Sequence, residues 1–299
     1  MRKMHIPAGA AVPALTILFF VFSVIGWLME VVLKWIQYGR FINRGFLIGP
    51  YCPIYGSGVV VITVLVGGLQ GREGTVGETF LAGLLVCGTL EYLVSWYMEK
   101  LFHARWWDYS HKPMNLNGRI WIGNLVLFGL ASVVIVKGID PFAFRVLLSW
   151  PPVVLHVLAV CCALLLVFDA AVSHFLMNLV RREIDAQEGD STEEISRRVR
   201  ELLRDRSLLL RRIQQAYPDW QARPRALTRQ LKEAKANYRQ AVRRARKAIR
   251  QAVKARRSAG KTGGVDWNAL AVQAEEARKA ARARLRAVQR RFFSHSEED

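Results

Sequence analysis

The chain has 299 residues, 52% of them hydrophobic, and a formal net charge of +19. The charge and the apolar residues occupy different parts of the chain, because residues 1–180 carry a net charge of +4 and residues 181–299 a net charge of +15. A single soluble domain does not separate its residues in this way, so that class is excluded. We predict a transmembrane domain over residues 1–180 and a basic helical tail over residues 181–299.

A helix needs roughly 20 mainly apolar residues to cross a bilayer. The segments that meet this requirement are 14–37, 51–70, 79–99, 119–137 and 147–178. The last segment contains Pro151 and Pro152, so we expect it to turn there and to span from about Val153. The predicted fold class is therefore all-α, a polytopic transmembrane bundle of about five spans with a cytoplasmic helical or coiled-coil tail.

Basic residues between the spans predict the orientation. Residues 34–44 and 100–119 contain more Lys and Arg than residues 71–78 and 137–145, and the tail contains the most. Lys and Arg are enriched on the cytoplasmic side of membrane proteins. We predict an external N-terminus and a cytoplasmic C-terminus.

Three carboxylates lie within the predicted spans, at Glu30, Glu91 and Asp169. Each precedes the cytoplasmic end of its span by eight to ten residues, so the three share a similar depth. The second and fourth spans, which run the other way, bring Tyr55 and Asn124 to the same depth. We expect the three carboxylates to face the interior of the bundle, because a charge in hydrocarbon is costly.

Two interpretations of this polar layer remain open. It is either a site for a substrate or ion, or a set of ion pairs and hydrogen bonds that fixes the bundle. The candidate charge partners are the basic residues nearest this depth, Lys34, Arg44, Arg105 and Arg119. We expect at least one carboxylate to lie within reach of an arginine.

The two predicted cytoplasmic loops have distinctive sequences. Residues 39–56 are apolar but contain Pro50 and Pro53, so we expect an irregular backbone that is buried in protein rather than in lipid. Residues 102–119 combine aromatic and hydrogen-bonding side chains with Asn-Gly turn chemistry. Their candidate motif residues are Trp106, Trp107, Asp108, Asn115 and Asn117; the tryptophan pair alone is typical of a cap at the membrane interface.

The motifs in these segments resemble the ABC-transporter type IV family of bacterial membrane proteins over about residues 15–175. The segments that carry the resemblance are Trp27–Glu30, Arg44–Gly56, Glu91-Tyr92, Arg105–Ser110 and Asn115–Arg119. The resemblance implies a multi-pass protein of the bacterial plasma membrane and a permease component of a transporter, without assigned catalytic residues. Gly123-Asn124 departs from the pattern, and the tail lies outside it.

An ABC transporter requires an ATPase, and this chain lacks a P-loop. Gly260-Lys261-Thr262 has Ala255 where a P-loop requires glycine, and a basic helix precedes it in place of a strand. Any ATPase would therefore be a separate chain. We also expect no catalytic activity and no cofactor. A metal site is not expected either, because the four cysteines lack metal-ligand spacing: Cys52, Cys87, Cys161 and Cys162.

Apolar and alanine residues recur in the tail at three- and four-residue steps from Leu227 to Val253 and again from Trp267 to Phe292. Two such stripes joined by a glycine-rich loop predict an antiparallel helical hairpin over residues 226–293. Its positive charge favours anionic lipid headgroups, because the tail leaves the bilayer at the cytoplasmic leaflet. A protein partner is the alternative, and nucleic acid is disfavoured because no base-reading motif is present.

The leading functional hypothesis is a permease component that moves an unknown substrate across the bilayer. The alternative is a non-transporting membrane scaffold that presents the basic tail to lipid or to a protein partner. An intramembrane enzyme ranks third, because the sequence contains no nucleophile and base in a recognisable pairing.

Overall fold

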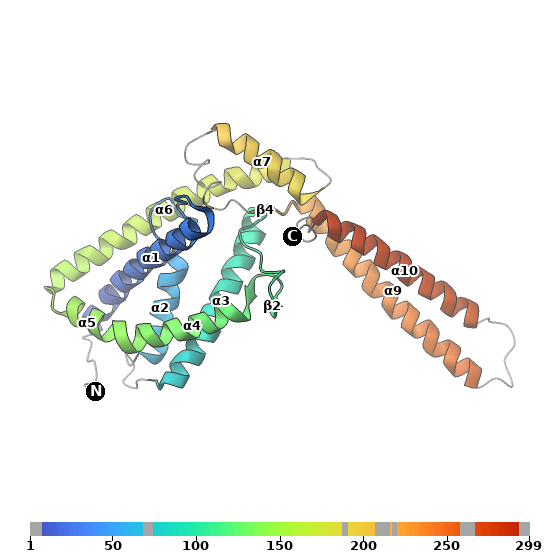
Figure 1. Cartoon of the computed structure of the whole chain (residues 1–299), viewed down its shortest axis with the longest axis horizontal. Coiled ribbons are helices and arrows are strands. Elements are labelled where there is room, and N and C mark those ends of the chain that lie inside the picture. Colours follow the sequence, from blue (N-terminus) through green and yellow to red (C-terminus); the bar gives the residue numbers. More distant parts are fainter. Residues whose placement is uncertain are drawn as a thin grey trace. The chain divides into compact units, whose positions relative to one another are not determined.

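The computed structural model describes residues 8–67, 74–186, 191–206, 216, 220–257 and 267–292. The fold is all-α, as the sequence predicted, and its helices are shown in Figure 1. The chain forms two compact units. The first comprises residues 1–183 and 199–220, and the second comprises residues 184–198 and 221–299.

The first unit contains seven helical segments within the described residues: α1 (Ala8–Tyr38), α2 (Pro53–Val66), α3 (Val76–Phe102), α4 (Ile122–Val134), the π-helix η1 (Ile135–Ile139), α5 (Asp140–Leu148) and α6 (Pro152–Ala186). Apolar stretches become helices because a backbone in hydrocarbon must satisfy its own hydrogen bonds. The start of α3 is fixed by a capping box, in which Thr75 and Glu78 bond each other's backbone N–H.

Four helical runs are long and apolar enough to cross a membrane: Gly9–Tyr38, Val76–Phe102, Ile122–Leu148 and Pro152–Ala186. The predicted second span differs, because α2 has 14 residues and reaches only about 21 Å, against a hydrocarbon core of about 30 Å. It ends at Val66, with Gly67 as its C-cap, and residues 68–70 of the predicted span lie outside the described residues.

The fourth span also differs from its predicted bounds. The sequence predicted an end at residue 137, but the helix continues through the π-helical turn η1 into α5 and ends at Leu148. A π-helical turn absorbs an extra residue without breaking a helix. Pro141 stands directly after this turn, in the first turn of α5.

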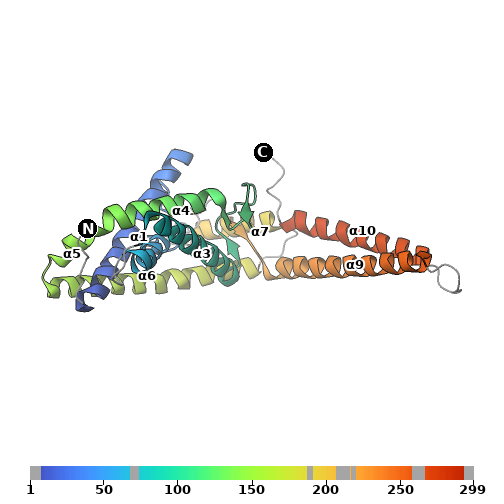
Figure 2. The same cartoon turned by 90° about the horizontal axis from the view of Figure 1, so that it is seen from below.

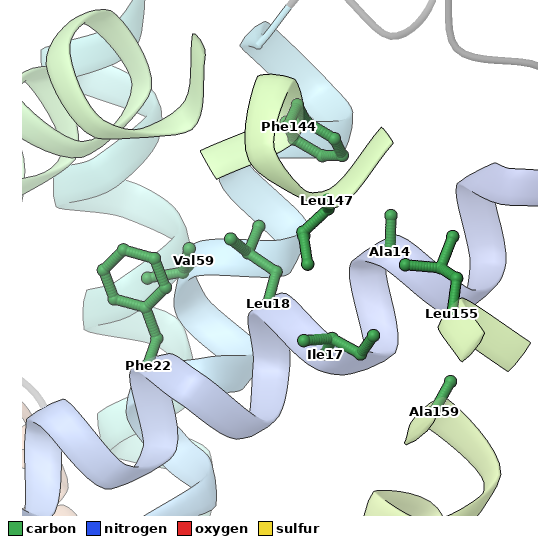
Figure 3. Close-up of a cluster of buried hydrophobic side chains, with 9 residues drawn as sticks. All are labelled: Ala14, Ile17, Leu18, Phe22, Val59, Phe144, Leu147, Leu155 and Ala159. Carbon is green, nitrogen blue, oxygen red and sulfur yellow. The ribbon is translucent and has the colours of Figure 1, made fainter. Parts of the chain in front are cut away.

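Buried apolar side chains from four helices form a core near the start of α1 (Figure 3). Its members are Ala14, Ile17, Leu18, Phe22, Val59, Phe144, Leu147, Leu155 and Ala159. The outer face of α6 is apolar as well, and its exposed residues include Val153, Val157, Leu164, Val167 and Phe168. An exposed apolar surface of this extent on a helix of membrane-spanning length is typical of contact with lipid.

Glycine allows two helix pairs to approach closely. A Cβ atom on Gly56 of α2 would lie 2.2 Å from the Phe19 carbonyl oxygen of α1. A Cβ atom on Gly83 of α3 would lie 2.1 Å from the Ser132 hydroxyl of α4. Small residues at such crossings are typical of membrane helix packing.

The segment between α3 and α4 folds into short strands, β1 (Ala104–Arg105), β2 (Asn115–Leu116) and β3 (Ile120–Trp121). β2 and β3 are antiparallel, with Asn115 opposite Trp121. Asn117 and Gly118 connect them with φ values of 55° and 67°, as the Asn-Gly sequence predicted.

The second unit contains the first part of α7 (Thr192–Arg206, divided between the units after Arg198), β4 (Gln221–Ala222), α9 (Arg225–Arg257) and α10 (Trp267–Phe292). α9 and α10 lie side by side along their lengths (Figures 1 and 2). The buried side of α9 is formed by Leu227, Leu231, Ala234, Ala245 and Ala252. The glycine-rich loop between the two helices lies outside the described residues.

Candidate functional site

The Glu30 carboxylate joins α1, the following loop and α2. Arg44 donates from Nε to Glu30 Oε2 at 3.4 Å, and the Tyr55 hydroxyl donates to Glu30 Oε1 at 2.6 Å. The structure therefore places an arginine on one predicted carboxylate. Lys34, another candidate partner, donates to the Gln37 side chain at 2.6 Å.

The Glu91 carboxylate lies between α3 and the start of α4 and is only 8% exposed. Asn124 donates from Nδ2 to the two Glu91 oxygens at 3.1 and 3.4 Å, and the Tyr109 hydroxyl donates at 3.3 Å. Trp121 donates to Asn124 Oδ1 at 2.9 Å and so orients the amide. Burial and the Glu91 charge raise the pKa of Tyr109, which therefore remains a protonated donor.

The Asp169 carboxylate of α6 holds the apolar loop. It accepts hydrogen bonds from Ile48 N at 2.8 Å, Gly49 N at 2.6 Å, the Tyr51 hydroxyl at 2.6 Å and the Ser173 hydroxyl at 2.8 Å. Other side chains of this loop are buried, including Ile42 and Leu47. The expectation that the loop has an irregular backbone buried in protein is therefore confirmed for Ile42, Leu47 and Tyr51.

Arg105 and Arg119 meet at a carboxylate that the sequence did not single out. Arg105 Nε lies 2.8 Å and Arg119 Nη2 lies 3.1 Å from Glu99 Oε2. Arg105 also lies 3.4 Å from Asp108, and Arg119 donates to the Ser95 hydroxyl at 3.1 Å. The sequence analysis did not select Glu99 because it stands beside Lys100 at the end of a predicted span. In the structure the chain reverses at His103 and brings both arginines back to this carboxylate.

The remaining loop-motif residues hold the segment between α3 and α4 together. Trp107 donates to the Arg119 carbonyl at 3.1 Å, and Asn117 donates to the Tyr92 hydroxyl at 2.9 Å. Asn115 accepts from Gly118 N at 2.9 Å. Trp106 is buried, with its ring centroid 6.3 Å from that of Trp220, so it packs inside the first unit.

A further intramembrane carboxylate, Asp140, was also missed. Its side chain is fully buried, and the Thr63 hydroxyl of α2 donates to its Oδ2 at 2.6 Å. In the described part of the chain, its Oδ1 has no hydrogen-bond partner. The sequence placed Asp140 in an external loop because the continuation of the helix through η1 was not foreseen.

The carboxylates therefore fall into two groups. Glu30 and Glu99 have arginine partners, and Asp169 has four donors, two of them backbone N–H groups. Glu91 and Asp140 are hydrogen-bonded only by neutral side chains among the described residues. A buried carboxylate without a counter-charge is stabilised by binding a proton or a cation. Glu91 and Asp140 can therefore each bind a proton or a cation.

Over the described ranges, no three His, Cys, Asp or Glu side chains come together as a metal site. A groove of about 400 Å³ lies in the second unit between α9 and α10, and its walls include Glu233, Asn237, Arg284 and Arg291.

Membrane-length apolar helices, apolar outward faces and carboxylates buried inside the spans define a polytopic integral membrane protein. The family model described as "Putative ABC-transporter type IV" matches residues 17–174, more than half of the chain. The chain belongs to this family, as its motifs indicated. The matched range includes all five carboxylates described above. The chain matches no curated protein and no solved structure.

We predict that Glu99→Gln destabilises the membrane domain. The substitution removes the charge that faces Arg105 and Arg119, which are 9% and 8% exposed. Removing one partner of a buried ion pair costs about 3 kcal/mol or more. The melting temperature in detergent should fall by several degrees.

The control is Glu233→Gln, which alters an exposed pair 4.0 Å from Arg229. This variant should melt like the parent, since exposed pairs contribute little. Equal melting temperatures for the parent, Glu99→Gln and Glu233→Gln would show that the ion pairs of Glu99 do not stabilise the segment between α3 and α4.

Proposed function

We propose that this protein is the membrane-embedded, permease-type component of a transport system, with cation or proton binding at Glu91 and Asp140. One observation carries the proposal. These two carboxylates lie within membrane-length helical runs, are at most 8% exposed, and have only neutral donors among the described residues. Intramembrane carboxylates of this kind mark ion and proton pathways.

The positions of the two carboxylates support a pathway. Glu91 binds Asn124 near the start of the run Ile122–Leu148, and Asp140 lies 16 residues further along the same run. At 1.5 Å per residue the separation is about 24 Å, most of the hydrocarbon thickness. One carboxylate therefore belongs near each face of the membrane.

Family membership supports a transport-related role, and it bears on the source of energy as well. The sequence contains no P-loop, so we propose that an ATPase, where one takes part, is a separate chain. A proton or cation gradient acting through Glu91 and Asp140 is the other source that the geometry supports.

A non-transporting scaffold is the second candidate function. The observation in its favour is the highly basic pair of helices α9 and α10, which lies outside the matched range 17–174. This alternative predicts a bundle in which Glu91 and Asp140 serve only packing.

We predict that Glu91→Gln abolishes cation-linked activity but leaves the protein intact. Glutamine keeps the volume and the hydrogen-bonding capacity toward Tyr109 and Asn124 but cannot bind a proton or cation as a carboxylate does. The full-length protein would be reconstituted in liposomes with an internal pH dye and tested under H⁺, Na⁺ and K⁺ gradients. The parent should show flux, and Glu91→Gln and Asp140→Asn should not.

Glu78→Gln is the matched control on the same helix, because glutamine also completes a capping box. It should retain parental flux. Parental flux in Glu91→Gln would refute the proposed site. Loss of the Glu91→Gln protein itself, or a parent without flux under any gradient, would favour the scaffold.

We further propose that the protein resides in the bacterial plasma membrane with its N-terminus outside and its C-terminus in the cytoplasm. The basic residues of 34–44, 100–119 and the tail support this orientation. Reporter fusions after Asp299 and within residues 71–77 should report opposite sides, the C-terminal fusion being cytoplasmic. An external C-terminal reporter would contradict the orientation.

A further inference from the structure

The charge of the second unit is concentrated in α9 and α10. Together these helices contain 20 Lys and Arg residues but only three acidic residues, Glu233, Glu275 and Glu276. Glu275 is paired with Arg278. The three acidic residues can neutralise only a small part of this positive charge. The two helices are therefore attracted to anionic surfaces and repelled by cationic ones.

The basic residues of α9 lie on one face. The structure describes eleven Lys and Arg side chains on this helix, all of them exposed. At about 100° per residue, ten of them fall within an arc of about 120°, roughly opposite the buried side, and Arg244 is the exception. We name these ten the basic stripe: Arg225, Arg229, Lys232, Lys235, Arg239, Arg243, Arg246, Lys247, Arg250 and Lys254.

The arc contains no acidic residue of α9, because Glu233 projects about 40° beyond its edge. The stripe extends about 44 Å along the helix axis. A straight row of cations on one face of a helix matches a flat anionic surface, which it can contact along its whole length.

We infer that the basic stripe of α9 docks on the anionic lipid headgroups of the membrane that the protein itself spans. Chain connectivity favours this occupant. α6, a membrane-length helix, ends at Ala186, and only five residues separate it from Thr192 at the start of α7. The second unit is thus tethered near a leaflet surface, where the effective headgroup concentration is high and Lys and Arg are attracted. This inference is independent of the proposed transport function.

The test uses the full-length protein in nanodiscs of neutral phosphatidylcholine or with about 30% phosphatidylglycerol, whose charge supplies the attraction. Lysine acetylation is measured residue by residue by mass spectrometry. Lys232, Lys235, Lys247 and Lys254 should react about tenfold more slowly in the anionic discs, whereas Lys279 of α10 should not change. The protection should disappear in about 0.5 M salt, which screens charges beyond a few ångströms.

Two triple variants with equal loss of charge separate the stripe from net charge. Arg239→Gln, Arg243→Gln and Arg250→Gln lie on the stripe, and together they should weaken docking about 100-fold. Arg244→Gln, Arg282→Gln and Arg286→Gln lie off it and should leave the protection of the stripe lysines nearly unchanged.

Three results would overturn the inference. The first is equal acetylation in neutral and anionic discs. The second is an equal effect of the two triple variants, which would assign the attraction to overall charge. The third is protection of the same lysines in neutral discs by a labelled oligonucleotide or an acidic peptide, with no protection by anionic lipid, which would assign the stripe to that partner.

Discussion

The fold of the membrane domain depends on how Asp169 is satisfied. Hydrocarbon provides no water to solvate a carboxylate or an irregular backbone, so each must find its partners in the protein. Asp169 accepts hydrogen bonds from the Ile48 and Gly49 N–H groups and from two hydroxyls. These bonds supply donors to the carboxylate and an acceptor to the irregular backbone. The loop that leads into α2 is thereby fixed against α6, and it is this loop that places Arg44 and Tyr55 on Glu30.

The same requirement separates the carboxylates that have arginine or backbone donors from the two that we propose to be functional. A carboxylate with arginine or backbone donors is already stabilised as an anion, and its role in packing is sufficient explanation. Glu91 and Asp140 lack such partners among the described residues, so their ionised forms depend on something that the protein does not supply. The family motif can be understood in these terms, since Tyr109, Asn115 and Asn117 shape the loop that closes over Glu91.

Sequence reasoning located most of the polar layer but not all of it. Hydropathy, the Asn117-Gly118 turn and the depth count depend on local geometry. The depth count placed Tyr55 and Asn124 in one layer with the carboxylates, and in the structure Tyr55 donates to Glu30 and Asn124 to Glu91. Asp140 escaped because a π-helical turn carried the helix past its expected end. Glu99 escaped because its arginines reach it only after the chain reverses at His103, which adopts a left-handed conformation with φ 53°. Neither event has a signal in hydropathy, and depth counting along straight spans ignores both.

The role of Asp169 can be measured at Cys52, which is 8% exposed at the start of α2. In a protein whose other three cysteines are alanine, the labelling rate of Cys52 by N-ethylmaleimide reports whether the loop is held. Asp169→Ala should raise this rate at least about tenfold while helix content is unchanged, because four donors lose their acceptor. Asp185→Ala, which removes an exposed carboxylate near the end of α6, should not raise it. An unchanged Cys52 rate in Asp169→Ala would contradict the account.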